Sequence, residues 1–568
     1  MFKNLPQDPQ QAYDWTWEDY QPYFDDLHQR ELTDDNTDAW LKDWAAIAKL
    51  MDEVYTRLYI ATTVDTTDKE GEKMYFRFLE NIVEPAQAIQ DKLQRKLLDS
   101  GQTPDGFEVP LRSIRGSVEL FREENLPLQT QLSKLGKEYD AIAGAQTVEW
   151  EGEEKTLTQM KVMLMDSDRE KREKVWRAIY ERQLEDREAL NALWQKMLKL
   201  RLQVAENADK DNFRDYMWIA RDRFDYTPED DLHFLSSIEE VVVPAMLRLM
   251  EKRKKAMGLK SLSPWDMQVD TTGDEPLKPF EEADALILTG SNIFAQVDPE
   301  LHVFYRDMET NDMLDLDNRK GKAPGGYCTG LPHTEHSFIF MNAVGTHDDV
   351  QTLLHEAGHA FHNYEATHLP YIQQRDYPTE FAEVASMSME LLAQPYLVKE
   401  KGGFYTEEEA ARAGIEHLEG LINFWPYMAI VDAFQHWVYT HPEEAMEPEN
   451  CDAQWNSLWQ RYLPGVDWTG LKDIRETGWH RKLHIFHIPF YYIEYGLAQL
   501  GAVQVWRNSL NDAVKALDNY RAALALGNTR PLPELFDAAG AKLAFDPVTL
   551  GEAVALIEQT LDELYAKL

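Results

Sequence analysis

Apolar residues recur at spacings of three and four along much of the chain, and this period constrains the fold more than any other feature. In the stretch AWLKDWAAIAKLMDEVYTRLYIA, residues 39–61, the apolar side chains fall on one face of a helix. The same spacing continues between residues 155 and 205. Such a stripe is typical of a helix that packs its apolar face against a core. The pattern therefore predicts a mainly α-helical fold.

The chain is long for a single compact core. Its 568 residues, of which 43% are hydrophobic, can bury a large interior, and a chain of this length is expected to form two or more domains. One stretch, GLKSLSPWDMQVDTTGDEPLKPF at 258–280, is rich in Pro, Gly and Thr. We predict that it is a long internal connection.

Residues 312–342 have a different pattern from the rest of the chain. They begin with an alternating MLDLD, pass through a Gly/Pro turn at 321–326 and end in SFIFMN, 337–342. This pattern predicts a small antiparallel β-sheet beside the helix that follows. If 337–342 is an edge strand, an extended peptide could pair with it by strand addition, with Phe338 and Phe340 as substrate-binding residues. The alternative is a hairpin that only packs against the core.

Composition argues against several classes of protein. The formal net charge of −42 at pH 7 argues against binding nucleic acid through its phosphates. The two cysteines, Cys328 and Cys451, are too few for a disulfide scaffold in a chain of this length. The start MFKNLPQDPQ does not resemble a signal peptide, and no apolar run reaches the roughly 18 residues that a membrane span needs. These features predict a cytoplasmic protein with no membrane partner.

Residues 355–359, HEAGH, fit the pattern H-E-x-x-H. Because positions i and i+4 share a helix face, His355 and His359 can bind one zinc ion through two imidazoles. Glu356 is rotated by about 100° from His355, which puts it beside the open coordination position rather than among the ligands. The motif therefore predicts a metal centre with an acid–base carboxylate next to it.

The helix that carries this motif has its own start signals. Thr346 or Asp348 can cap its first turn, and the acidic side chains of Asp348 and Asp349 suit a helix N-terminus. We expect the helix to lie near 348–366.

A catalytic zinc ion needs three protein ligands and one open position, so the sequence should hold a third ligand. The continuation H-E-x-x-H-x-x-G-x-x-H is absent, since His362 stands at the Gly position and Glu365 at that of the last His. The stretch DYPTEFAEVASMSMELLAQPY instead places Glu380, Glu383 and Glu390 near one face of a second helix. Three carboxylates on a mainly apolar helix predict a cation opposite them, and each is a candidate ligand.

Together these two stretches resemble the thimet oligopeptidase and oligoendopeptidase F family of zinc metallopeptidases. The family pattern is H-E-x-G-H-x-x-H, then F-x-E-x-x-S-x-x-x-E. MLDLDNRKGK, DREKREKVWRAI at 168–179 and HIFHIPFYYIEYG at 484–496 resemble further parts of the oligoendopeptidase F branch, so the resemblance runs from about residue 160 to 500. The motif positions that match are His355, Glu356, Gly358, His359, His362, Phe381, Glu383, Ser386 and Glu390.

The resemblance implies a fold and an activity. The fold would be a large helical ellipsoid with a deep substrate channel and the small sheet beside the HExxH helix. Region 1–200 would be an N-terminal helical region, and 201–568 the catalytic metallopeptidase region. The activity would be zinc-dependent hydrolysis of internal bonds in short, unfolded peptides.

The resemblance also assigns roles at the centre. His355, His359 and Glu383 would hold one zinc ion per chain, and Glu356 would be the catalytic carboxylate. Glu390 and Glu380 would orient a ligand histidine from behind. His362 would pack or act behind the ligands as well, because a fourth protein ligand would close the open position.

A late aromatic segment, RKLHIFHIPFYYIEYG, supplies hydrogen-bond donors. Peptide hydrolysis builds negative charge on the carbonyl oxygen, which Tyr O–H and imidazolium N–H groups stabilise. By the resemblance, His484, Tyr491 and Tyr495 are candidate catalytic residues, and Tyr492 a substrate-binding residue. The alternative for each tyrosine is core packing.

Two other functions use the same residues. A zinc carboxypeptidase would need a cation for the substrate carboxylate, and Arg319, Arg375 or Arg481 could supply it. A peptide-binding metalloprotein without catalysis would not need Glu356. Cobalt or manganese could replace zinc at such ligands. The sequence assigns no oligomeric state.

Overall fold

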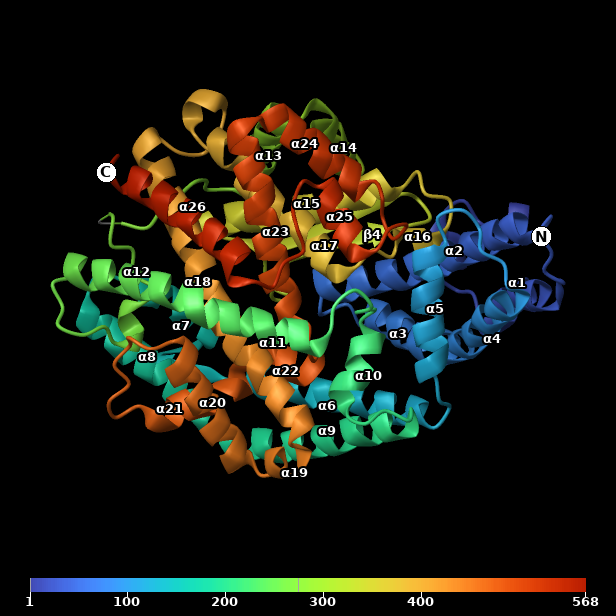
Figure 1. Cartoon of the computed structure of the whole chain (residues 1–568), viewed down its shortest axis with the longest axis horizontal. Helices are drawn as coiled ribbons and strands as arrows, with labels where there is room; N and C mark the ends of the chain where they lie inside the picture. The colour runs from blue at the N-terminus through green and yellow to red at the C-terminus, as the bar shows by residue number, and fades with distance from the viewer. Residues whose placement is uncertain (1, 274) are drawn as a thin grey trace. The chain divides into compact units, whose positions relative to one another are not determined.

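The computed structural model describes residues 2–273 and 275–568 and is mainly helical, as predicted (Figure 1). The backbone divides into two units that each use three stretches of chain. Unit 1 comprises 1–119, 277–410 and 498–543; unit 2 comprises 120–276, 411–497 and 544–568. The division predicted at residue 200 does not coincide with these bounds and stays a prediction about where the catalytic region begins.

Unit 1 contains helices from the beginning, the middle and a late part of the chain. Its α-helices are α1 (Trp17–Gln29), α2 (Thr37–Val64), α3 (Lys69–Phe78), α4 (Glu84–Ser100), α5 (Glu108–Leu120), α13 (Ala283–Val297), α14 (Pro299–Thr310), α15 (His347–Ala366), α16 (Ile372–Arg375), α17 (Thr379–Ala393), α24 (Ala513–Leu524) and α25 (Leu532–Ala538). Its strands are β3 (Leu314–Asp317), β4 (Tyr327–Leu331) and β5 (His336–Ala343).

Unit 2 adds a short hairpin, β1 (Thr147–Trp150) and β2 (Glu153–Thr156), to its helices. Its α-helices are α6 (Asn125–Gly144), α7 (Leu157–Val162), α8 (Arg169–Leu184), α9 (Arg187–Asn207), α10 (Phe213–Ala220), α11 (Pro228–Ser237), α12 (Val243–Ala256), α19 (Pro442–Ala445), α20 (Pro448–Tyr462), α21 (Lys472–Glu476), α22 (Leu483–His487) and α26 (Pro547–Tyr565). In the part of the chain that the structure describes, three α-helices run across a bound between the units: α5, by its last residue Leu120, α18 (Glu407–Thr440) and α23 (Tyr492–Asn511).

The apolar stripe at 39–61 lies within α2 and packs into the core of unit 1. Trp40, Trp44 and Ile47 on this helix are at most 1% exposed. The indole N–H of Trp40 donates to the Leu27 carbonyl at 2.8 Å, so this buried ring also satisfies its one polar atom. The helical period therefore identified a true core face.

The predicted connection at 258–280 contains one short helical turn, Pro264–Asp266, and the chain passes from unit 2 to unit 1 at 276–277. Asp274, which falls within this stretch, lies outside the described residues. The prediction of a connection is confirmed for the part of it that the structure describes.

The sheet beside α15 has the strand order β3-β5-β4 and is mixed. β4 pairs with β5 antiparallel, as predicted, with Cys328 opposite Ile339. β3 pairs with β5 parallel, so the prediction of an antiparallel sheet is wrong for this pair. Alternating sequence predicts that a segment is a strand, but its neighbours depend on packing. The most apolar strand, β5, takes the centre, where both of its edges are covered.

The central place of β5 corrects the prediction that 337–342 is an edge strand. Phe338 and Phe340 are 7% and 1% exposed and belong to a hydrophobic cluster with Leu331. The ring of Phe340 stacks on Tyr327 with centroids 5.0 Å apart. Both phenylalanines are core residues in this structure, so the reason for assigning them to substrate binding no longer holds.

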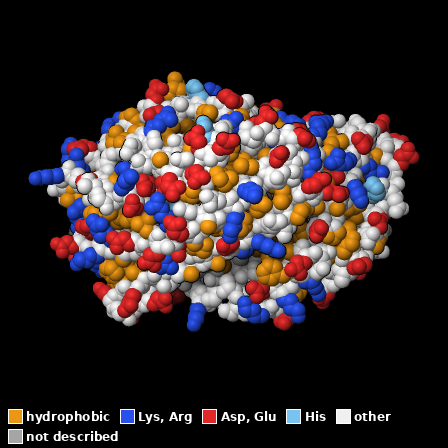
Figure 2. All heavy atoms as spheres, turned by 90° about the horizontal axis from the view of Figure 1, so that it is seen from below, with side chains coloured by type: hydrophobic (Ala, Val, Ile, Leu, Met, Phe, Trp, Pro, Cys, Tyr) orange, Lys and Arg blue, Asp and Glu red, His pale blue; other side chains and the backbone are white. Residues whose placement is uncertain are grey.

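Charged side chains cover the surface without segregating by sign on the face drawn in Figure 2, where acidic and basic groups are interspersed. Among the described residues, no helix is both long enough and apolar enough to span a membrane.

Candidate metal centre

Helix α15 begins where its sequence predicts. Thr346 is the N-cap, and its Oγ1 accepts a hydrogen bond from the backbone N–H of Asp349 at 3.3 Å. The carboxylate of Asp349 in turn accepts from the backbone N–H of Thr346 at 2.8 Å, which completes a capping box. This reciprocal cap fixes the start of the helix two turns before His355.

Helix α15 packs directly against α17, and Gly358 is the reason that the two backbones come so close. A Cβ at this position would lie 2.6 Å from the Cα of Ser386 and 2.8 Å from the carbonyl oxygen of Ala385. Both neighbours are backbone atoms, which cannot rotate away. The glycine inside HEAGH therefore sets the distance between the helix of the two histidines and the helix of the glutamates.

Gly358→Ala is expected to push α15 from α17 and to weaken both the fold and the metal centre. Overpacking of this kind costs about 1–3 kcal/mol in the free energy of unfolding. Denaturant unfolding and zinc titration of the purified variant would measure the two effects. Gly420→Ala on α18 is the matched control, since a Cβ there meets nothing within 4 Å. Equal stability of the two variants would contradict the role given to Gly358.

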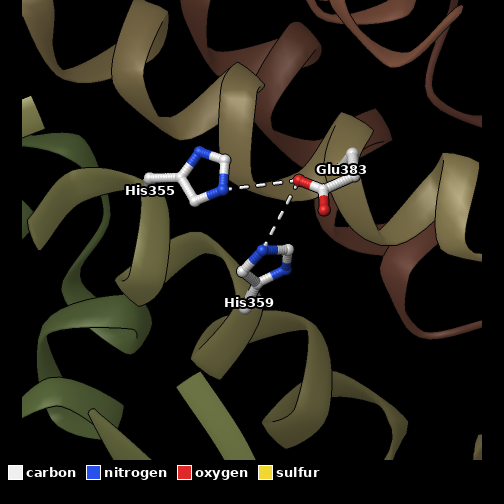
Figure 3. Close-up of side chains that lie close together, drawn as sticks. All are labelled: His355, His359 and Glu383. Carbon is white, nitrogen blue, oxygen red and sulfur yellow. Dashed lines mark ion pairs between the residues drawn. The ribbon is translucent and has the colours of Figure 1, made fainter. Parts of the chain in front are cut away.

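Three side chains from these two helices converge, as Figure 3 shows. His355 Nε2 lies 3.3 Å and His359 Nε2 lies 3.6 Å from the same Glu383 oxygen, Oε2. One ligand atom from each residue lies within 4.8 Å of the other two. Ligands of a tetrahedral zinc ion lie about 3.3 Å apart, because each bond is close to 2 Å. Two imidazoles and one carboxylate at these separations fit a zinc ion.

Glu390 holds His355 from behind. His355 Nδ1 lies 2.6 Å from Glu390 Oε1, and because a carboxylate only accepts, Nδ1 carries the proton. The lone pair of a neutral His355 is then on Nε2, which faces Glu383. This is the arrangement that orients ligand histidines in metal sites.

The two glutamates that were predicted to support a ligand histidine, Glu390 and Glu380, therefore differ in what they contact. Glu390 contacts His355, and its role behind a metal ligand stays a prediction. Glu380 is also buried on α17, and its role behind the ligands stays a prediction.

Glu390→Gln is expected to lower zinc affinity by roughly 10- to 100-fold, because an amide is a weaker acceptor for the His355 proton. Competition with a chromophoric chelator would measure it. Glu365→Gln, which removes a carboxylate of α15 that pairs with Arg521 at 2.7 Å, is the control and should leave zinc affinity unchanged. Equal affinities for both variants would contradict the role of Glu390.

Burial and neighbouring charges together set the pKa values of the side chains at this centre, and Glu383 and Glu390 raise that of His355 against the effect of burial. Burial raises the pKa of Glu356 to about 7, partly offset by the positive charge of His355. Burial lowers the pKa of His359 to about 4, which keeps its imidazole neutral at pH 7 and able to bind a metal. A divalent cation between the ligands would add positive charge beside Glu356 and lower its pKa.

His362 takes no part in the ligand set. It is fully buried, and its ring stacks on Tyr377 with centroids 3.4 Å apart. Neither ring nitrogen has a hydrogen-bond partner within the part of the chain that the structure describes. Burial lowers the pKa of His362 well below its usual value, so the ring is neutral. His362 therefore packs against Tyr377, and packing is one of the two roles that were predicted for it.

Two residues at the centre were not singled out by spacing. Ser386 Oγ donates to Glu383 Oε2 at 3.1 Å and so orients the candidate third ligand; the family pattern contains this serine, and its place three residues after Glu383 on a helix is the local signal for the contact. Cys328 on β4 lies beside Glu356, and a hydrogen bond from its backbone favours the charged form of that carboxylate. No local pattern links residues so far apart.

The predicted donors of the late aromatic segment cluster in unit 2, whereas the candidate metal ligands belong to unit 1. The ring centroid of His484 lies 4.8 Å from Tyr492 and 6.2 Å from Tyr495, and that of Tyr491 lies 5.2 Å from Tyr495. Lys482 Nζ lies 3.6 Å from the centroid of the Tyr492 ring. The four predicted residues therefore form one polar aromatic cluster, and their catalytic role stays a prediction.

Comparison with known proteins gives a consistent result. The family model for peptidase family M3 matches residues 162–549. Oligopeptidase PepF of Bacillus subtilis (strain 168) is 27% identical over 330 residues, which cover 57% of this chain and 47% of that protein. The chain thus spans about half the length of the curated relatives it matches.

Solved structures match over nearly the whole chain. A structure described as PZ peptidase A with an inhibitor is 26% identical, with a TM-score of 0.87 and 99% of both chains covered. A putative oligoendopeptidase F from Bacillus anthracis str. Ames is also 26% identical, with a TM-score of 0.83 and coverage of 97% of this chain and 98% of that one. The predicted mainly helical fold and the predicted family are therefore confirmed.

Proposed function

The chain belongs to peptidase family M3, and from this membership we propose that it is a zinc-dependent endopeptidase that cleaves internal bonds of short, unfolded oligopeptides. The observation that carries the proposal is the convergence of His355, His359 and Glu383. The names of the relatives, oligopeptidase and oligoendopeptidase, support short peptides as substrates. One zinc ion at this centre and a cytoplasmic location are parts of the same proposal.

In peptide-bond hydrolysis, the zinc ion and the protein side chains would have different tasks. Zinc held by His355, His359 and Glu383 would supply a Lewis acid that polarises the scissile carbonyl and lowers the pKa of the attacking water. Glu356 accepts a proton from that water and donates it to the leaving amine. A carboxylate whose pKa burial has moved toward neutrality suits both transfers, since it can take the proton and release it again.

The edge of the sheet beside Glu356 is a place for the peptide backbone. β4 has one neighbour in the sheet, β5, and carries Cys328, whose backbone approaches Glu356. An extended peptide that pairs with β4 by strand addition would pass next to the catalytic carboxylate. Main-chain pairing of this kind depends on few side chains of the peptide, so short peptides of different sequence could bind in this way.

The aromatic cluster completes the proposal. His484, Tyr491 or Tyr495 would donate a hydrogen bond to the developing oxyanion, and Tyr492 would contact substrate. If a tyrosine is the donor, Tyr491→Phe or Tyr495→Phe would remove the hydroxyl that donates. That variant is expected to lower kcat by roughly 100-fold or more while leaving zinc content unchanged.

The alternative function, a carboxypeptidase, needs a cation for the substrate carboxylate, and the two candidate arginines of unit 1 support it less well. Arg319 lies 2.5 Å from Asp315 and 2.9 Å from Asp317, and Arg375 lies 2.9 Å from Glu335. Each of these guanidinium groups already has a carboxylate partner, so a substrate carboxylate would compete with it.

Mass spectrometry of a mixed peptide pool tests the proposal. We expect internal cuts in short peptides, no cuts in a folded protein substrate and no cuts by the Glu356→Gln variant. Stepwise loss of C-terminal residues would identify a carboxypeptidase instead. Binding of peptides without any cleavage would identify a peptide-binding metalloprotein.

A further inference from the structure

A second group of metal-binding side chains lies in unit 2. Asp432 and His436 are one helical turn apart on α18, and Asp231 lies on α11 (Figure 1). Their spacing on α18, i and i+4, is the same as that of His355 and His359 on α15, so both side chains point from one helix face. All three are buried, with exposures of 0% for Asp231 and Asp432 and 4% for His436.

The three side chains meet at one ring nitrogen. His436 Nε2 lies 3.0 Å from Asp231 Oδ2 and 3.3 Å from Asp432 Oδ2. One ligand atom from each lies within 4.8 Å of the others, as at the first centre. These separations match the roughly 3.3 Å between ligands of a tetrahedral ion. The geometry is therefore as close to a metal site as that of His355, His359 and Glu383.

Several oxygen and nitrogen atoms of this group have no protein partner. Asp231 Oδ1, Asp432 Oδ1 and His436 Nδ1 lack a hydrogen bond to any described residue, whereas Asp432 Oδ2 has the 3.3 Å contact with His436 Nε2. The rings of Trp218 and Phe490 lie 5.8 Å and 5.3 Å from the His436 ring and make the surroundings apolar. Buried carboxylate oxygens in such surroundings are costly unless a cation binds them.

Arg223 supplies part of the positive charge near this group, since its charge acts on Asp231. Arg223 Nη2 and Arg221 Nη1 lie 2.9 Å and 3.3 Å from the same Glu494 oxygen, so that one carboxylate serves two guanidinium groups. Two carboxylates beside a neutral imidazole carry two negative charges, and one divalent cation held by all three side chains would neutralise them directly.

We propose that Asp231, Asp432 and His436 bind a second divalent transition-metal ion, separate from the one at His355, His359 and Glu383. One imidazole and two carboxylates suit Zn²⁺, Mn²⁺, Fe²⁺ or Co²⁺. The ion is structural, because its ligands are buried among apolar rings. It ties α11 to α18, which are about 200 residues apart in sequence, and stabilises unit 2.

Metal counting on the full-length chain tests this proposal. Metal-free protein is incubated with Zn²⁺, Mn²⁺ or Co²⁺ alone, passed through a desalting column and analysed by plasma mass spectrometry. With at least one of these ions we expect two ions per chain for the wild type, one for His355→Ala/His359→Ala, one for Asp432→Asn/His436→Gln, and none for the four substitutions together.

The matched control is Asp266→Asn, at a buried carboxylate of unit 2 that pairs with Arg169 at 2.8 Å. It should lose stability yet keep two ions, which separates loss of a ligand from general weakening. The His355→Ala/His359→Ala variant leaves unit 2 unchanged, so the test holds even if the Asp432→Asn/His436→Gln chain fails to fold. No ion in that first-centre variant, with all three metals, would overturn the proposal and leave protons as the charge that holds the group together.

Discussion

Glu356→Gln is expected to lower kcat/KM for a short peptide by roughly 100- to 10,000-fold, the range for loss of a general acid–base group. The amide has nearly the shape of the carboxylate but cannot accept the water proton. The three proposed metal ligands are untouched, so zinc content should equal that of the wild type. Continuous assay of a quenched fluorescent peptide, with zinc measured on the same sample, would give both numbers.

This loss should not come from unfolding. Burial raises the pKa of Glu356 above the value of the unfolded chain, so above that value the buried charge lowers the stability of the metal-free fold. Removing the charge should therefore leave metal-free Glu356→Gln at least as stable to heat as metal-free wild type. Retention of more than a tenth of the wild-type turnover would show that another group carries the proton.

Glu383→Ala is expected to remove both zinc and activity. Glu383 is the anionic member of the proposed ligand set, and without it the two histidine nitrogens, 3.3 Å and 3.6 Å from its Oε2, would share the ion without charge compensation. Loss of a supporting residue already costs about 10- to 100-fold in metal affinity, so loss of a ligand should cost more than about 100-fold. Zinc competition titration and peptide assay would measure the two effects.

Added zinc distinguishes this variant from Glu356→Gln. Excess zinc should restore part of the turnover of Glu383→Ala and none of that of Glu356→Gln, since only the former is limited by occupancy. Ser386→Ala, which removes one hydrogen bond to Glu383 Oε2, is the graded control and should fall between wild type and Glu383→Ala. Wild-type zinc affinity in Glu383→Ala would mean that another residue is the third ligand.

The two metal groups raise the same physical question, which is how a fold keeps carboxylates inside an apolar helical interior. At Glu383 the answer is two imidazoles and, by our proposal, zinc. At Asp231 and Asp432 it is one imidazole and, by the further inference, a second ion. If both ions bind, the chain couples catalysis in unit 1 and helix pairing in unit 2 to the same divalent cations.

Short-range features were readable from the sequence because helix geometry is local. The stripe at 39–61 predicted a core face of α2, Thr346 was one of two residues predicted to cap α15, and the i, i+4 spacing put His355 and His359 on one face. Each of these depends only on 3.6 residues per turn and on backbone groups within one turn.

Only the tertiary structure decided which distant residues meet. Spacing on α17 left Glu380, Glu383 and Glu390 as equal candidates, and the approach of α15 across Gly358 placed Glu383 before both histidines and Glu390 behind one. The spacing of apolar residues likewise could not predict that β5 is the central strand of its sheet. The sequence by itself determined the helices and the ligand faces, because local hydrogen bonds and side-chain period set them. The choice among ligands and the order of strands depended on packing between segments far apart in the chain, which no local period encodes.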